Sequence, residues 1–217
     1  MRKLIVGAMT SIDGVMQAPG GPQEDPTGGF THGGWVFPYF DETAGQAIGE
    51  LFAKPFDLLL GRKTYDIFSA YWPGRDDSIG RAFDRVTKYV ATRNPDLKLD
   101  WQKSQALGPD VVASLKKLKS EDGPDLLTQG STDLLRTLFA HDLVDEINLI
   151  LFPLVLGKGK RLFGDGAAPG AFELVRSMTT PAGVTVNRYA RAGAVATGSF
   201  ASDPPSEAEL ERRGKLA

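Results

Sequence analysis

The sequence predicts a single α/β domain whose sheet is mostly parallel in its middle. Strand-like and helix-like segments alternate along most of the chain, which is the pattern of a sheet with crossover helices. Residues 146–156 form a nearly continuous apolar run, typical of a strand buried on both faces. A chain of 217 residues with 41% hydrophobic content can bury one sizeable core. We therefore expect one domain.

The N-terminal elements are predicted from apolar runs and the residues that break them. Residues 4–9 form an apolar strand that ends before the turn pair Asp13-Gly14. Residues 41–54 place their apolar side chains on one side, as a helix does, and Pro55 closes this helix. A short apolar strand follows at 57–60, and the segment after it is predicted to be a helix.

The central elements repeat this alternation of strand and helix. Residues 79–87 are helical in pattern, and residues 88–92 form a strand. Residues 110–120 carry an apolar stripe at helical spacing. Residues 125–128 form a strand that a glycine interrupts, and residues 133–140 form the next helix. This order favours parallel strands joined by crossover helices.

The last part of the chain predicts an antiparallel pair and a tail. Residues 172–178 and 184–191 alternate around a Pro-Ala-Gly turn, as a closing hairpin does. In the tail, Ser206 is followed three residues later by Glu209, a capping-box spacing that opens a short charged helix. We assign residues 1–195 to the domain and residues 196–217 to a charged C-terminal tail.

A Gly-rich segment of roughly twenty residues, 18–38, separates the first strand from the first helix. Loops of this length in a compact domain are generally functional or disordered. The segment also contains aromatic residues, which makes it too apolar for a simple linker; they are Phe30, Trp35, Phe37 and Tyr39. We interpret it as a lid or pocket wall, with packing on the core as the alternative.

Composition excludes several classes of partner. The net charge is −2 and the basic residues are dispersed, which argues against nucleic acid as the main partner. The chain has no cysteine, and His32 and His141 lack metal-ligand spacing, so no metal site is expected. No apolar run approaches the ~20 residues that span a bilayer. Without a signal-peptide pattern, the expected location is the cytoplasm.

Three strand ends carry residues suited to phosphate. Gly61-Arg62-Lys63-Thr64 places two cations at the start of a helix, where the helix dipole disfavours them and a bound anion would relieve the conflict. Thr92-Arg93 offers a hydroxyl and a guanidinium. Gln129-Gly130-Ser131-Thr132 allows close backbone approach. Ligands of open α/β sheets bind at such carboxyl ends. The alternatives are a solvated turn at the first segment and an ordinary N-cap with a turn glycine at the third.

Other nucleotide and hydrolase motifs do not fit. The glycine-rich segment 157–164 has the wrong spacing for a Rossmann fingerprint and no helix-like pattern directly after it. The chain also has no P-loop and no G-x-S-x-G elbow.

Residues 59–65, Leu-Leu-Gly-Arg-Lys-Thr-Tyr, resemble the strand-to-helix cofactor motif of the dihydrofolate reductase-like superfamily. Ser11-Ile12-Asp13-Gly14 resembles the S-hydrophobic-D-G turn of its riboflavin-biosynthesis pyrimidine reductase branch, the C-terminal domain of the bifunctional deaminase-reductase. Residues 143–147 and 152–163 also resemble that branch. The resemblance spans roughly residues 2–191.

The resemblance implies a single-domain, three-layer fold with an eight-stranded mixed, mostly parallel sheet and helices on both faces. It further implies an NADPH-dependent reductase that transfers hydride to a small heterocyclic or imine-like substrate, and a homodimer. The cofactor residues that it implies are Met9, Thr10 and Met16 beside the nicotinamide; Gly61, Arg62, Lys63 and Thr64 at the phosphates; Thr92 and Arg93 near the 2′-phosphate; and Gln129, Gly130, Ser131 and Thr132 at the pyrophosphate.

Two carboxylates are candidate catalytic residues, Asp13 and Asp41. Each also has an ordinary structural interpretation, because aspartate commonly forms turns and caps helices. Five aromatic residues could stack on a flat ring, with core packing as their alternative role: Trp35, Phe37, Tyr39, Tyr71 and Trp72.

The chain also departs from the riboflavin reductase branch. Gly7 stands where that branch carries a lysine, and Gln129-Gly130-Ser131 stands in place of Glu-Gly-Gly. Asp66-Ile67-Phe68 replaces its D-N/D-P segment. These differences leave two alternatives open: a dihydrofolate reductase, in which Asp41 or Glu42 would face the pocket, and a non-catalytic NADPH-binding protein.

Overall fold

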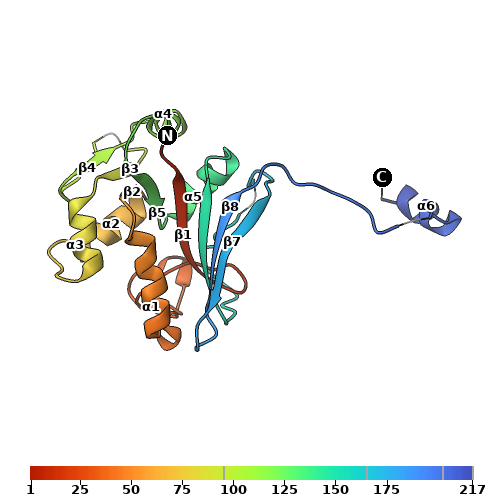
Figure 1. Ribbon diagram of the computed structural model, residues 1–217, viewed down its shortest axis with the longest axis horizontal. Helices are drawn as coiled ribbons and strands as arrows, with labels where there is room; N and C mark the ends of the chain where they lie inside the picture. The colour runs from red at the N-terminus through yellow and green to blue at the C-terminus, as the bar shows by residue number, and fades with distance from the viewer. Residues whose placement is uncertain (95, 165, 202, 217) are drawn as a thin grey trace.

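Eight strands form one sheet in the computed structural model, which describes residues 1–94, 96–164, 166–201 and 203–216. The strand order is β4-β3-β2-β5-β1-β6-β8-β7 (Figure 1). Strands β1 to β6 are parallel to one another, and β8 pairs antiparallel with both β6 and the edge strand β7. The prediction of a mixed, mostly parallel sheet is confirmed.

The strands are β1 (Leu4–Ser11), β2 (Phe56–Gly61), β3 (Lys88–Ala91), β4 (Ser104–Ala106), β5 (Asp125–Thr128), β6 (Glu146–Phe152), β7 (Phe172–Thr179) and β8 (Thr185–Arg191). The helices are α1 (Glu42–Gly49), α2 (Arg62–Tyr71), α3 (Ser78–Arg85), α4 (Val111–Ser120), α5 (Thr132–Ala140) and α6 (Glu207–Gly214).

Helices cover both faces of the sheet because the central strands alternate apolar side chains between the two faces. Leu59 of β2 packs in a cluster with α4 and α5 residues. Its neighbours Leu58 and Leu60 pack in another cluster with Tyr65 of α2 and Phe83 of α3. Ile48 of α1 packs in a third cluster, which includes the C-terminal half of β6. The expected three-layer arrangement is therefore present.

The Gly-rich segment 18–38 packs against the sheet. Phe30, Trp35 and Val36 are buried in the cluster that contains Phe152 of β6. The Trp35 ring meets Phe152 edge-on with 5.3 Å between centroids, and Trp35 Nε1 donates to the Gln17 carbonyl at 2.8 Å. Packing on the core, the alternative interpretation of this segment, is confirmed.

Three element boundaries differ from the predictions. Strand β4 was missed because its three residues carry no apolar pattern. The expected strand 146–156 ends at Phe152, since Pro153 has no N–H to donate, and several of its side chains are only half-buried. The expected helix 41–54 is shorter, because α1 ends at Gly49 and passes into a 3₁₀ turn, Glu50–Phe52.

The C-terminal helix α6 lies at the end of an extended segment, away from the sheet (Figure 1). The Ser206 hydroxyl accepts a hydrogen bond from Glu209 N at 3.3 Å, as the capping-box spacing predicts. No residue of α6 is buried. Among the described residues, no helix is long and apolar enough to cross a membrane.

Candidate cofactor site

The three strand ends singled out by sequence line one cleft of about 360 Å³. Neighbouring strands β3, β2 and β5 run in the same direction, so their carboxyl ends meet at one edge of the sheet. The cleft is lined by Gly61, Arg62, Lys63, Ala91, Thr92, Arg93, Asn94, Val111, Ser131, Asp133, Leu134 and Thr137. The expectation that these loops share a cleft is confirmed.

Two helices that begin at this cleft, α2 and α5, have no side-chain cap. Gly61 at the N-cap of α2 has no side chain to offer, and the Ser131 hydroxyl makes no capping hydrogen bond at α5. The other four α-helices among the described residues are each capped by a side chain, from Asp41, Asp77, Asp110 or Ser206. The N–H groups at the start of α2 and α5 are therefore available to an anion.

The cations at the cleft differ in how they are paired. Arg62 forms an ion pair with Asp66 one turn further along α2, at 2.8 Å. Lys63 and Arg93 are exposed and have no ion pair with any described residue. The cleft's acidic residue, Asp133, is itself paired to Arg136 at 3.7 Å. Lys63 and Arg93 are therefore the charges most available to a bound phosphate.

Two glycines let the β2–α2 and β5–α5 connections approach each other closely. Gly61 N donates to the Gly130 carbonyl at 3.2 Å. A Cβ on Gly61 would lie 2.1 Å from Ser131 Oγ, and one on Gly130 would lie 2.9 Å from Thr64 Oγ1. The Gly130–Ser131 peptide bond is cis. Side chains at these two positions would force the two helix N-termini apart.

Four of the implied cofactor residues lie beside the cleft without lining it: Thr64, Gln129, Gly130 and Thr132. Thr64 and Thr132 are in the first turns of α2 and α5. The Gln129 side chain lies over Gly7, with Gln129 Cγ 3.8 Å from the position of a Cβ there. Thr92 does line the cleft, and its hydroxyl accepts a hydrogen bond from Asn94 N at 3.0 Å.

The three residues implied beside the nicotinamide lie on or after β1. Thr10 is buried within that strand. Met9 packs against the cluster that holds the Gly-rich segment, whereas Met16 packs against the cluster under α4 and α5. Strand β1 is next to β5 in the sheet, so Met9 and Thr10 lie one strand away from the strand that leads to Gly130 and Ser131.

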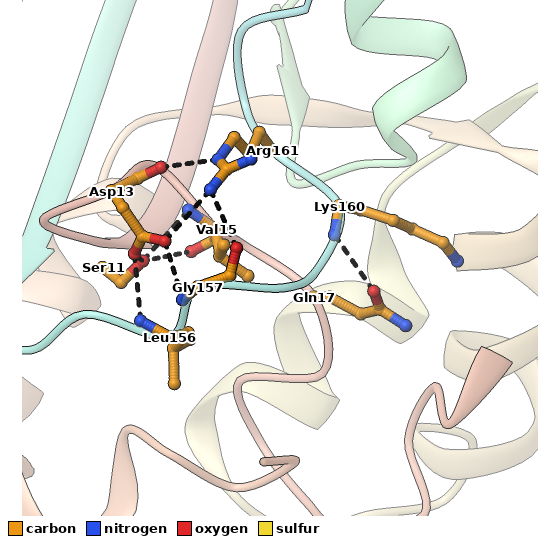
Figure 2. Close-up of polar contacts among 8 residues, drawn as sticks. All are labelled: Ser11, Asp13, Val15, Gln17, Leu156, Gly157, Lys160 and Arg161. Carbon is orange, nitrogen blue, oxygen red and sulfur yellow. Dashed lines mark hydrogen bonds and ion pairs between the residues drawn. The ribbon is translucent and has the colours of Figure 1, made fainter. Parts of the chain in front are cut away.

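Asp13 has a structural role in the turn after β1 (Figure 2). Its carboxylate accepts hydrogen bonds from Ser11 Oγ at 2.6 Å, Leu156 N at 3.1 Å and Gly157 N at 2.9 Å, and it pairs with Arg161 Nη2 at 3.2 Å. The Ser11 hydroxyl is the main reason why the pKa of Asp13 lies well below its ordinary value. An ionised and fully engaged carboxylate is a poor proton donor. These contacts give Asp13 the turn-forming role that was the alternative to catalysis.

Asp41 likewise serves as the N-cap of α1. Its carboxylate accepts from Ala44 N at 2.7 Å and from Ala182 N at 3.2 Å, so it also connects the helix to the β7–β8 turn. The hydrogen bond from Ala44 N is the first cause of its lowered pKa. These contacts give Asp41 the capping role that was the alternative to catalysis.

Sequence reasoning missed a polar cluster that ties the Gly-rich segment to the rest of the domain. Gln17 Oε1 accepts from Lys160 N at 3.0 Å (Figure 2). Gln17 Nε2 donates to the carbonyls of Asp25 and Thr27, both at 2.9 Å. Lys160 Nζ pairs with the Asp25 carboxylate. We call Gln17, Asp25, Thr27 and Lys160 the loop clasp.

The fold and the cleft place the chain among α/β proteins of dihydrofolate reductase-like architecture. Its sequence matches the model of the RibD C-terminal domain family over residues 2–186, and the protein belongs to that family.

The chain is also similar to individual proteins of known sequence or structure. The uncharacterized protein YyaP of Bacillus subtilis is 27% identical over 193 residues, which cover 84% of this chain and 92% of that protein. A pyrimidine reductase-like protein from Corynebacterium diphtheriae has a similar structure, with a TM-score of 0.59 and 14% identity, covering 88% of this chain and 92% of the other. Dihydrofolate reductase from Enterococcus faecalis, solved with NADP(H), has a TM-score of 0.55 and 14% identity, covering 87% and 96%. At these identities the structures support the fold alone.

Proposed function

We propose that the protein is an NADPH-dependent reductase that transfers hydride to a small heterocyclic or imine-like substrate, as in the pyrimidine reductase step of riboflavin biosynthesis. Membership of the RibD C-terminal domain family supports a reductase of this general kind. When bound, the nicotinamide would supply the hydride, and a proton from solvent would complete the reduction.

The observation that carries the proposal is the convergence of two uncapped helix N-termini and two unpaired cations on one cleft. The N–H groups of α2 and α5 would bind phosphate oxygens, and Gly61 and Gly130 would allow the backbone to approach them closely. Lys63 and Arg93 would supply the positive charge. An adenine dinucleotide that carries an additional phosphate matches this pattern of donors better than NADH does.

The dihydrofolate reductase alternative gains little support from the first helix. Asp41 is occupied as a cap, and Glu42 is exposed and accepts a hydrogen bond from Gln46 at 3.3 Å. Neither carboxylate lies on the apolar side that α1 turns to the sheet, where Ala44, Ala47 and Ile48 are buried.

The decisive measurement compares the affinities for NADPH and NADH by isothermal titration calorimetry. We expect the double variant Lys63→Ala, Arg93→Ala to weaken NADPH binding by roughly a hundredfold or more, since it removes two charge-assisted hydrogen bonds that contribute about 1.5–3 kcal/mol each. NADH binding should change much less. Lys116→Ala, an exposed lysine of α4 outside the cleft, is the matched control. Equal losses for the two cofactors would reject the phosphate assignment.

A further inference from the structure

A second cavity, of about 130 Å³, lies between α1 and the sheet. Its roof includes Ala47 and Leu51, and its floor includes Ile5 of β1, Leu127 of β5 and Val186 of β8. An engineered protein cavity of about 150 Å³ holds a benzene molecule. The α1 cavity therefore has room for one six-membered ring, and its walls are largely apolar.

The cavity adjoins the strand that leads to the implied nicotinamide residues. A Cβ on Gly7 would lie 3.4 Å from Leu51 Cδ1 and 3.8 Å from Leu127 Cδ1, and both of these leucines line the cavity. Gly7 and Met9 point to the same face of β1, because side chains alternate along a strand. A ring in the cavity would thus lie on the face of β1 that Met9 shares.

Asn148 places a half-buried polar side chain in the cavity. It pairs with Gly7 in the parallel register of β1 and β6, and it is half-buried. Its side-chain amide makes no hydrogen bond with any described residue. A half-buried amide in a mostly apolar cavity loses part of its hydration, so a ligand that satisfies it gains affinity.

Arg188 lies directly beside Asn148. The two residues are opposite one another in the antiparallel register of β6 and β8, which places their Cβ atoms about 4.5–5.5 Å apart. Arg188 Nε donates to Glu146 Oε2 at 3.0 Å, and the same carboxylate also pairs with Lys3. Glu146, whose side chain is only 6% exposed, therefore holds the guanidinium in place and leaves its two terminal nitrogens without a partner among the described residues.

We propose that Asn148 and Arg188 are the specificity determinants of the α1 cavity, which takes a single ring bearing a carbonyl or carboxylate oxygen. The uncommitted N–H groups of the two side chains would donate to that oxygen. The charged residues that line the cavity carry a net charge of +1, which also favours an anionic or electron-rich ligand; they are Lys3, Lys54, Arg176 and Arg188 against Glu50, Asp125 and Glu146. The assignment concerns the ligand of the α1 cavity; that this ligand is also the hydride acceptor rests on the proposed function.

The test uses the full-length, ¹⁵N-labelled protein and two probes with the same ring and opposite charge, benzoate and benzylamine. We expect benzoate to shift the Asn148 side-chain amide resonances in a saturable way, and benzylamine to leave them unchanged. Uracil, a neutral ring with carbonyl oxygens, should behave as benzoate does. Equal effects of benzoate and benzylamine, or no effect of benzoate on Asn148, would overturn the proposal.

Variants connect the effect to the two side chains. Because the Asn148 variants lack that side-chain amide, benzoate binding is followed in the wild type and in the variants by the shift of the Arg188 backbone amide. Asn148→Asp keeps the shape and pairs the new carboxylate with Arg188, and it should weaken benzoate binding at least tenfold. Asn148→Leu removes the donor without adding a charge and should also weaken binding at least tenfold. Asn187→Leu is the control, because Asn187 points to the opposite face of β8 and hydrogen bonds with Ser177 and Thr185. Unchanged binding in both Asn148 variants would contradict the assignment.

The same samples separate this proposal from the proposed function. Titration with NADPH reports on the cofactor cleft, and benzoate binding reports on the α1 cavity. Benzoate binding without NADPH binding would reject the reductase and retain the cavity assignment. NADPH binding without benzoate binding would retain the reductase proposal and reject the cavity assignment.

Discussion

Lys88 shows how a single buried charge can set the pH dependence of stability. Its side chain is fully buried at the start of β3. The ammonium group donates to the Gln102 carbonyl at 3.1 Å and lies 4.4 Å from the centroid of the Trp101 ring. Burial lowers the pKa of Lys88 from its ordinary 10.5 to about 8. The folded protein therefore gives up this proton more readily than the unfolded chain does.

We expect the free energy of unfolding of the wild type to rise with pH relative to that of Lys88→Met. Between pH 8 and pH 10.5 the unfolded chain binds more protons at this lysine than the folded protein does, so stability increases with pH over that window. Urea unfolding at pH 7, 8.5 and 10 measures the difference, with Lys117→Met as an exposed-lysine control. Parallel curves for the wild type and Lys88→Met would show that this lysine does not titrate as inferred.

Among the structural elements, α2 and α5 have N-termini that lie close together only because Gly61 has no side chain. Gly61→Ala should weaken NADPH binding and lower the melting temperature, because the new Cβ would lie 2.1 Å from Ser131 Oγ and 2.9 Å from Ser131 N. Overpacking of this kind typically costs about 1–3 kcal/mol. Calorimetric titration and thermal unfolding measure the two effects.

Gly49→Ala is the matched control for Gly61→Ala. Gly49 ends α1, and a Cβ there meets nothing within 4 Å. This variant should be neutral or more stable by up to about 1 kcal/mol, since alanine favours helix. Unchanged NADPH affinity in Gly61→Ala would mean that the close approach of the two helix starts is not needed for binding.

The loop clasp makes a prediction about the Gly-rich segment. Gln17→Leu removes hydrogen bonds to Lys160 N and to the carbonyls of Asp25 and Thr27, and it leaves these groups unsatisfied. We expect amide hydrogen exchange across residues 18–38 to accelerate by about tenfold or more, which corresponds to about 1–3 kcal/mol of lost local stability. Gln46→Leu, on the exposed side of α1, should leave exchange unchanged. Equal exchange in both variants would contradict a role for the clasp.

The elements that were predicted from the sequence are defined by short-range patterns. The features that were missed depend on contacts between residues far apart in the chain. The starts of α2 and α5 and most strands follow from local apolar periodicity and from glycines, which neighbouring residues determine. Strand β4 has no such pattern and pairs only because Lys88–Val90 lies beside it. The contacts of Asp13 with Leu156 and Gly157 join residues 143 and 144 positions apart, and no local pattern predicts which amides a carboxylate will meet.

At the scale of the whole molecule, Gln129 lies close to residues of both the cofactor cleft and the α1 cavity, although it lines neither. This residue precedes Gly130 and Ser131 in the sequence, and its side chain reaches over Gly7 beside the cavity. The three strand ends that were singled out from the sequence line one cleft because parallel strands bring their carboxyl ends together. The cavity was not predicted, because its lining comes mainly from six strands, from α1 and from the 3₁₀ turn after α1. These residues are dispersed along the chain and form no sequence motif.

The division between domain and tail predicts that residues 196–217 can be removed without loss of fold or binding. None of the α6 residues is buried, so their removal uncovers no core. We expect a chain that ends at residue 195 to melt within about 2 °C of the full-length protein and to bind NADPH equally well, because surface changes away from packed features are usually within about 0.5 kcal/mol.

Light scattering on both chains also measures the expected homodimer, for which the edge strand β7 offers exposed Leu174 and Val175. A monomer at micromolar concentration would contradict the homodimer, and a dimer lost only on truncation would assign assembly to the tail.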